Sequence, residues 1–96
     1  MTFSFHPEAE REFLAATDYY ESCESGLGQD FALEIYSTIQ HICAFPKAWP
    51  LLEPEIRRSL VHRFPFGVIY AEEKGQVHVL AVMHLHRNPD YWKDRL

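Results

Sequence analysis

The chain has 96 residues, enough for one domain that buries somewhat over half of the surface its unfolded form exposes. Its hydrophobic fraction of 47% and aromatic fraction of 15% predict a packed core and exclude a disordered segment. The net charge of −5 argues against general nucleic-acid binding, and no apolar run approaches the roughly 20 residues of a membrane-spanning helix.

Charge is unevenly distributed along the chain. Residues 1–55 carry ten acidic and two basic side chains, a net of −8, whereas residues 56–96 carry four and seven, a net of +3. An anionic or acidic partner is therefore expected to meet the C-terminal half. The opening residues lack the basic and apolar regions of a secretory signal. We expect a single soluble, cytoplasmic domain over residues 1–96.

The first elements are a strand and a helix. Phe3 and Phe5 alternate with polar neighbours, which predicts a strand over residues 2–6. Pro7 suits the first turn of a helix, and the glycines of residues 25–28 are expected to end it. One apolar stripe runs along this helix at spacings of four, three and four: Ala9, Phe13, Ala16 and Tyr20. Its glutamates, Glu8, Glu10 and Glu12, favour the helix N-terminus and are expected to face solvent.

A second helix is predicted from residue 29 to residue 45, and Pro46 stops it. Its apolar stripe consists of Phe31, Ile35, Thr38, Ile42 and Phe45, and Ala32 and Ile39 widen it. The two helices and their short joint form a helical hairpin, whose apolar stripes require a shared cover.

Three strands are predicted after an irregular, proline-rich segment at residues 46–55. They span residues 56–63, 67–72 and 76–84, with a hairpin turn at residues 73–75. Strict alternation places Val77, Val79, Ala81 and Met83 on one face of the last strand, and Leu80 and Val82 on the other. Both faces therefore need a cover. The helical hairpin is expected to supply one, and a partner chain is a candidate for the other.

The predicted fold is accordingly α+β: an N-terminal strand, a helical hairpin, a three-stranded antiparallel sheet and a short tail at residues 85–96. Cys23 and Cys43 have no zinc-ligand spacing and are expected to be reduced packing residues. His84 and His86 would share a face of a continuing strand, but no third metal ligand has convincing spacing. We expect neither a metal nor a cofactor.

Several short motifs occur in a recognisable order along the whole chain. They are Gly26-Leu27-Gly28-Gln29-Asp30-Phe31, Phe45-Pro46 with Trp49-Pro50, Ile56-Arg57-Arg58, Arg63-Phe64-Pro65-Phe66 with Tyr70, Val79-Leu80-Ala81-Val82 with His84, and Arg87-Asn88-Pro89-Asp90-Tyr91-Trp92 followed by Arg95. In this order the chain resembles the ParE/RelE superfamily of toxins, most closely its ParE-like, plasmid-stabilisation branch.

The resemblance implies a toxin of a type II toxin–antitoxin system, neutralised by a cognate antitoxin. RelE-like members cut mRNA within the ribosome, whereas ParE-like members with an assigned target inhibit DNA gyrase. Because both branches share the fold, the fold does not choose between these targets. A third alternative is a decayed toxin that only binds its antitoxin.

RNA cleavage would require a base, an acid and cations, and His84, Arg87 and Tyr91 are the candidates. RelE-like nucleases are rich in lysine and arginine, which suits binding to ribosomal RNA. This chain has only three lysines and is acidic. The sequence therefore favours a toxin that acts by binding a protein, without specific DNA contact, and not an enzyme.

Two sets of contact residues follow. The tail residues Arg87, Tyr91, Trp92 and Arg95 are expected to bind the target, although Tyr91 and Trp92 can instead fold the tail over the sheet. The antitoxin is expected to contact a second set, consisting of Arg57, Arg58, Arg63, Leu80 and Val82. For the adjacent pair Arg57 and Arg58, a solvated strand edge is the alternative interpretation.

Overall fold

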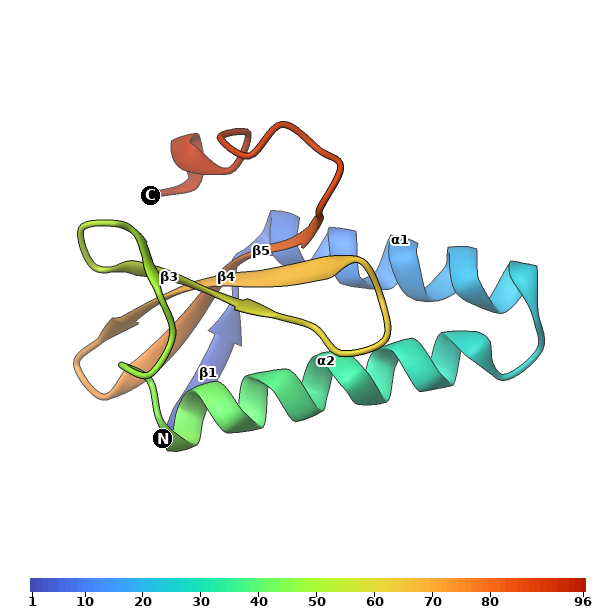
Figure 1. Ribbon diagram of the computed structural model, residues 1–96, viewed down its shortest axis with the longest axis horizontal. Coiled ribbons are helices and arrows are strands. Elements are labelled where there is room, and N and C mark those ends of the chain that lie inside the picture. The colour runs from blue at the N-terminus through green and yellow to red at the C-terminus, as the bar shows by residue number, and fades with distance from the viewer.

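A computed structural model describes all of residues 1–96 and shows a five-stranded sheet with two helices on one face (Figure 1). The elements are β1 (Thr2–Phe5), α1 (Pro7–Cys23), α2 (Leu27–Ala44), β2 (Leu51–Glu53), β3 (Ile56–Leu60), β4 (Phe66–Glu73), β5 (Gln76–His84) and the 3-10 turn η1 (Lys93–Arg95). The strand order is β1-β5-β4-β3-β2, with β1 parallel to β5 and the other neighbours antiparallel.

The predicted α+β class is confirmed, but the sheet has five strands and not three. The N-terminal strand joins the sheet, where Thr2 to Phe5 pair with Gln76 to Val79. The irregular segment predicted at residues 46–55 contains the short edge strand β2. Its flanking prolines, Pro50 and Pro54, lie outside the strand, where their missing N–H groups interrupt no ladder.

The joint between the helices differs from the prediction. The first helix ends at Cys23, before the glycines, and Gly26 adopts φ of 89° as the residue before α2, which begins at Leu27. The Glu21 carboxylate accepts from the N–H groups of Gly26 and Gly28, each at 3.1 Å. Gly28 lies where the helices touch, since a Cβ there would stand 2.6 Å from the carbonyl oxygen of Thr17.

The main core lies between the helices and one face of the sheet. Phe31, Ile35, Ile39 and Ile42 of α2 are fully buried there, as the apolar stripe predicts. Phe45 is the exception: it caps the helix with φ of −138° and is 65% exposed. Because α2 ends at Ala44, the helical spacing no longer sets the direction of the Phe45 side chain. The prediction that Phe45 belongs to the apolar stripe was therefore wrong.

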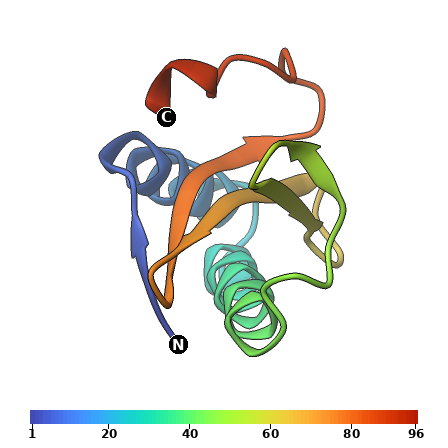
Figure 2. The same ribbon diagram turned by 90° about the vertical axis from the view of Figure 1, so that its left-hand side faces the viewer.

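A second, smaller core covers the opposite face of the sheet, and the chain's own tail builds it. Figure 2 shows the tail lying over the sheet on the side away from α2. Trp92, only 1% exposed, packs with Ile56, Ile69, Leu80, Ala81 and Met83, and Tyr91 packs against this cluster. The aromatic tail therefore supplies the cover for which a partner chain was the candidate.

A bulge in β5 decides which side chains face which core. Ile69 pairs with Ala81 and the next residue, Tyr70, pairs with Val79, so Leu80 has no partner across the ladder. An unpaired residue shifts the alternation by one position. Consequently Val82 faces the helices, while Ala81 and Met83 face the tail. The strict alternation predicted for this strand holds as far as Leu80 and was wrong from Ala81 onward.

The turns around β4 also depart from the predicted bounds. The strand expected over residues 56–63 stops at Leu60, and Arg63 adopts φ of 75° in the following turn. Between β4 and β5, Lys74 and Gly75 have φ of 53° and 74°. Positive φ at both central residues is the geometry of a two-residue hairpin turn that matches the twist of the strands.

Candidate functional site

The tail is fastened to the first helix through one carboxylate, that of Glu12 in α1. The two terminal guanidinium nitrogens of Arg95, Nη1 and Nη2, donate to it at 3.0 Å, and Arg87 Nη1 donates to it at 3.3 Å. The side chains of Glu12 and Arg95 are 13% and 11% exposed, so this two-pronged ion pair is largely shielded from water. We call Glu12, Arg87, Tyr91 and Arg95 the clasp.

Tyr91 lies between the two arginines of the clasp. The guanidinium carbons of Arg87 and Arg95 stand 3.7 and 4.9 Å from its ring centroid, within the range of cation–π attraction. Its hydroxyl is buried without a hydrogen-bond partner. Burial, and then the carboxylate of Glu12, raise the pKa of Tyr91 above its ordinary value. This phenol therefore holds its proton at neutral pH.

The clasp also completes the sheet where β1 stops. Beyond Phe5 no strand lies next to β5 on that side, and the His6 N–H donates to the Val79 carbonyl at 2.8 Å. Farther along, the Glu12 carboxylate accepts from the Val82 N–H, and Arg95 donates to the Leu80 carbonyl, both at 3.0 Å. These side chains satisfy backbone groups that would otherwise be left unpaired.

Glu12 was expected to face solvent, and the structure contradicts this. One sequence signal was available: Glu12 follows Ala9 by three residues and precedes Ala16 by four, which places it on the flank of the apolar stripe. Neither Arg87 nor Arg95 has a comparable signal, because only the returning tail brings them to α1.

The structure brings together three of the four predicted target-binding residues and separates the fourth. Arg87, Tyr91 and Arg95 all belong to the clasp, and the Arg87 side chain is 54% exposed. Trp92 is buried in the second core, and its indole N–H has no hydrogen-bond partner. The nuclease candidate His84 stands apart, with its ring against Phe66 at 5.1 Å and its Nδ1 accepting from the His86 N–H.

The predicted antitoxin-binding residues do not form one patch. Arg57 donates to the Trp49 carbonyl at 2.6 Å, and Arg63 pairs with Asp30 at 3.1 Å on the helical side. Arg58 forms no ion pair and lines a small hollow under the tail with Met83, Trp92 and their neighbours. Leu80 faces the tail side of the sheet, whereas Val82 is buried beneath the helices.

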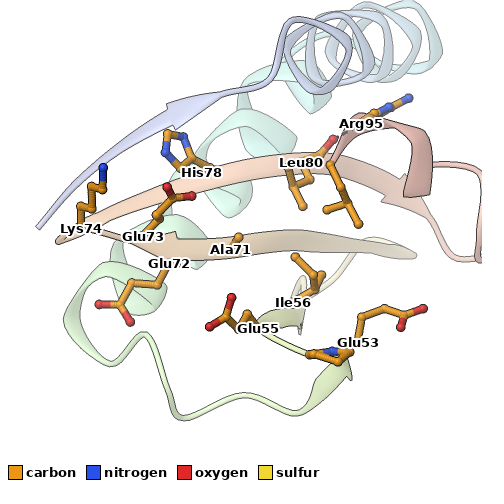
Figure 3. A pocket seen from close by; sticks show the side chains of 12 residues that line it. Glu53, Glu55, Ile56, Ala71, Glu72, Glu73, Lys74, His78, Leu80 and Arg95 are labelled. Atoms are coloured by element: carbon orange, nitrogen blue, oxygen red, sulfur yellow. Dashed lines mark hydrogen bonds between the residues drawn. The ribbon is translucent and has the colours of Figure 1, made fainter.

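The largest hollow, about 760 Å³, lies on the tail side of the sheet, beside the C-terminus (Figure 3). Its floor consists of Ile56, Ala71 and Leu80, from three adjacent strands. Four glutamates contribute to its lining, Glu53, Glu55, Glu72 and Glu73, and two of them, Glu55 and Glu72, also line a second hollow with Lys47 and Arg57. Lys74 and His78 lie at one end, and Arg95 at the other. We call this hollow the acidic groove.

No group of three or more histidine, cysteine, aspartate or glutamate side chains is arranged to hold a metal ion. Neither helix combines the length and apolar character needed to cross a membrane. Burial raises the pKa of the Cys43 thiol, which disfavours the reactive thiolate.

A sheet with a helical hairpin on one face and an arginine-bearing tail on the other defines a class of small α+β protein. The model of the family described as "ParE toxin of type II toxin-antitoxin system, parDE" matches residues 3–89. The chain therefore belongs to the ParE toxin family.

A solved structure has the same fold. It is described as the chromosomal ParDE toxin–antitoxin system from P. aeruginosa, and it superposes with a TM-score of 0.61 at 17% sequence identity. The similarity covers 90% of this chain and 97% of that one. Among curated proteins, none matches this sequence significantly.

Proposed function

We propose that this chain is a toxin neutralised by a cognate antitoxin and that it arrests growth by binding DNA gyrase. Family membership supports the toxin–antitoxin context. The net charge of −5 supports a protein target over ribosomal RNA, because dense phosphate favours a basic partner. The exposed half of the Arg87 side chain, next to Tyr91, is the proposed contact with the target.

The observation that carries this proposal is the engagement of two of the three nuclease candidates, Arg87 and Tyr91, within the clasp. The single carboxylate of Glu12 neutralises one of the two positive charges of Arg95 and Arg87, and both guanidinium groups are held by it instead of being free to move towards a pentavalent phosphate. The raised pKa of Tyr91 keeps its phenol protonated at neutral pH, so almost no phenolate is present to act as a base. His84 contacts other rings, away from the clasp. This arrangement suits a recognition surface better than general acid–base catalysis.

The test is a gyrase supercoiling assay with the purified toxin. We expect inhibition, and we expect Arg87→Ala to weaken it at least about tenfold, the loss of roughly one charged contact. Arg11→Ala is the matched control, since Arg11 forms only an exposed pair with Glu8 on α1. Uninhibited gyrase together with cleaved mRNA in toxin-expressing cells would show instead that the protein is a nuclease.

Antitoxin binding is tested separately, and the antitoxin to use is the product of a short upstream reading frame that overlaps the toxin gene, which the genomic neighbourhood is expected to show. A partner that binds only the folded toxin stabilises it, by about 2.7 kcal/mol at a concentration 100 times Kd. We therefore expect saturating antitoxin to raise the melting temperature of the toxin. Arg58 and Leu80, on the tail side of the sheet, are the proposed contacts that remain outside the helical core.

A further inference from the structure

We infer that an exposed apolar patch centred on Arg58 is the docking site for a partner segment that carries a carboxylate between apolar side chains. This inference rests on the proposed function, which supplies the antitoxin as the partner, and it adds the chemistry of the segment that binds. The patch consists of Leu52, Arg58, Leu60, Gly67 and Leu85, and we call it the Arg58 patch.

The Arg58 patch lies on the tail side of the sheet. In the ladder Arg58 stands opposite a residue of the second core and Leu60 stands opposite Gly67, so alternation directs both side chains to this side. A Cβ on Gly67 would stand 3.2 Å from Arg58 Cδ and 3.6 Å from Leu85 Cδ2, so both side chains lie over this glycine. Leu52 lines a small hollow together with Arg58. The three leucines are exposed, whereas the apolar floor of the acidic groove is largely buried.

Arg58 has no acceptor for its hydrogen bonds. Every other arginine of the chain donates to a carboxylate or to a backbone carbonyl, whereas the half-buried side chain of Arg58 forms neither a hydrogen bond nor an ion pair. Trp92, whose indole N–H also lacks an acceptor, lines the same hollow of about 170 Å³. The two carboxylates in this lining, those of Glu53 and Asp90, both bind Lys93.

The requirement for a carboxylate comes from this one guanidinium group. The charges of the lining balance, since Arg58 and Lys93 stand against Glu53 and Asp90, so no net field selects the partner. A segment that covers the three leucines also removes Arg58 from water, and a guanidinium buried without an acceptor is strongly disfavoured. The partner must therefore bring an acceptor, and a carboxylate matches the parallel donors of a guanidinium. Apolar side chains on either side of that carboxylate cover the leucines.

The same arrangement disfavours other occupants. A nucleic acid strand would bring a row of phosphates to a hollow whose charges already balance, and it would leave the leucines without an apolar cover. A second copy of this chain carries a net charge of −5, so two copies repel each other. A segment with one carboxylate among apolar residues satisfies both parts of the patch.

The first experiment measures antitoxin binding by calorimetry for charge variants of the toxin. We expect Arg58→Glu to bind at least about tenfold more weakly than the wild type, and Arg11→Glu, the same charge change on the exposed face of α1, to stay within about threefold. Arg58→Met keeps the stem over Gly67 and removes the donors. It should also lose at least about tenfold in binding, while the melting temperature of the free toxin stays unchanged because no bond is lost.

The second experiment tests the two halves of the partner segment. Each acidic residue of the antitoxin is changed in turn to arginine, and we expect one such variant to bind Arg58→Glu toxin at least about tenfold more tightly than the unchanged antitoxin does. For the apolar half, Leu60→Ser should weaken binding at least about fivefold, because a leucine then stays out of the interface. Leu33→Ser, at an exposed leucine of α2, is the matched control and should bind like the wild type.

The outcomes separate this inference from the proposed function. If Arg58→Glu and Arg58→Met bind the antitoxin as tightly as the wild type, the patch is not the docking site, although the toxin–antitoxin pairing stands. Equal weakening of Arg58→Glu and Arg11→Glu would reveal only long-range charge and would overturn the inference, as would the lack of any rescuing antitoxin variant. A toxin that dimerises by itself through Leu60 would make a second copy the occupant instead. If the wild type binds no antitoxin, the proposed function fails as well.

Discussion

Glu12 is the residue on which the tail depends most directly. Its carboxylate accepts from Arg95, from Arg87 and from the backbone N–H of Val82. Removing one member of a shielded ion pair leaves the other charge without compensation, at a cost of about 3–5 kcal/mol. The Glu12 side chain therefore contributes more to stability than a surface glutamate does.

We predict that Glu12→Ala lowers the free energy of unfolding by about 3–5 kcal/mol, as measured by urea denaturation. Glu12→Gln should cost less, because the amide oxygen can still accept from Val82. Glu10→Ala, an exposed change two residues away, should stay within about 0.5 kcal/mol of the wild type. Equal losses for Glu10→Ala and Glu12→Ala would contradict the role of the clasp.

The carboxylate of Glu12 has several hydrogen-bond partners, whereas the buried hydroxyl of Tyr91 has none. An unsatisfied buried polar group costs about 1–3 kcal/mol, so its removal relieves a penalty. We predict that Tyr91→Phe raises the free energy of unfolding by about 1 kcal/mol at pH 7. A clear loss of stability in this variant would show that the hydroxyl makes a favourable contact.

The raised pKa of Tyr91 also predicts how stability depends on pH. The unfolded chain loses this proton near the ordinary pKa of 10, whereas the folded protein retains it to higher pH. Above pH 10 the folded state therefore binds more protons, and stability falls as pH rises. Denaturation between pH 8 and pH 11 should show a shallower decline for Tyr91→Phe than for the wild type. Parallel curves would contradict this prediction.

At the scale of elements, the helical hairpin depends on a close approach at Gly28. A Cβ at this position would lie 2.6 Å from the Thr17 carbonyl oxygen and 2.9 Å from the Glu21 Cβ, so one helix would have to shift. We predict that Gly28→Ala lowers the free energy of unfolding by about 1–3 kcal/mol. Ser25→Ala, an exposed change in the same joint, is the control and should have little effect.

The bulge in β5 is the second feature at this scale. Because Leu80 has no partner across the ladder, the strand presents Val77, Val79 and Val82 to the helices, and Leu80, Ala81 and Met83 to the tail. The bulge also lies where the clasp meets the strand, at the Leu80 carbonyl and the Val82 N–H. One local irregularity thus connects the two cores and the clasp.

At the scale of the whole molecule, the tail works as the second layer of the fold. Trp92 is almost fully buried and packs across strands β3, β4 and β5. We predict that Trp92→Ala lowers the free energy of unfolding by about 3–5 kcal/mol and exposes an apolar face that binds a hydrophobic dye. Leu96→Ala, at a side chain that is 70% exposed, should do neither. A Trp92→Ala protein with wild-type stability would show that the tail only rests on the surface.

The sequence by itself determined the α+β class, the positions of both helices, the β4–β5 hairpin and the family. These features depend on local periodicity, on proline and glycine, and on the order of short motifs, all of which can be read along the chain. It also assigned Arg87, Tyr91 and Arg95 to one functional tail, and the structure brings these three residues together in the clasp.

Only the tertiary structure decided where Glu12 points, which faces the residues of β5 occupy and what covers the second face of the sheet. Glu12 meets Arg95 across 83 positions of sequence, and the bulge depends on pairing between two strands. Contacts of this kind join segments that are far apart in the sequence. Neither segment has a local pattern that indicates its partner, so the sequence does not predict them.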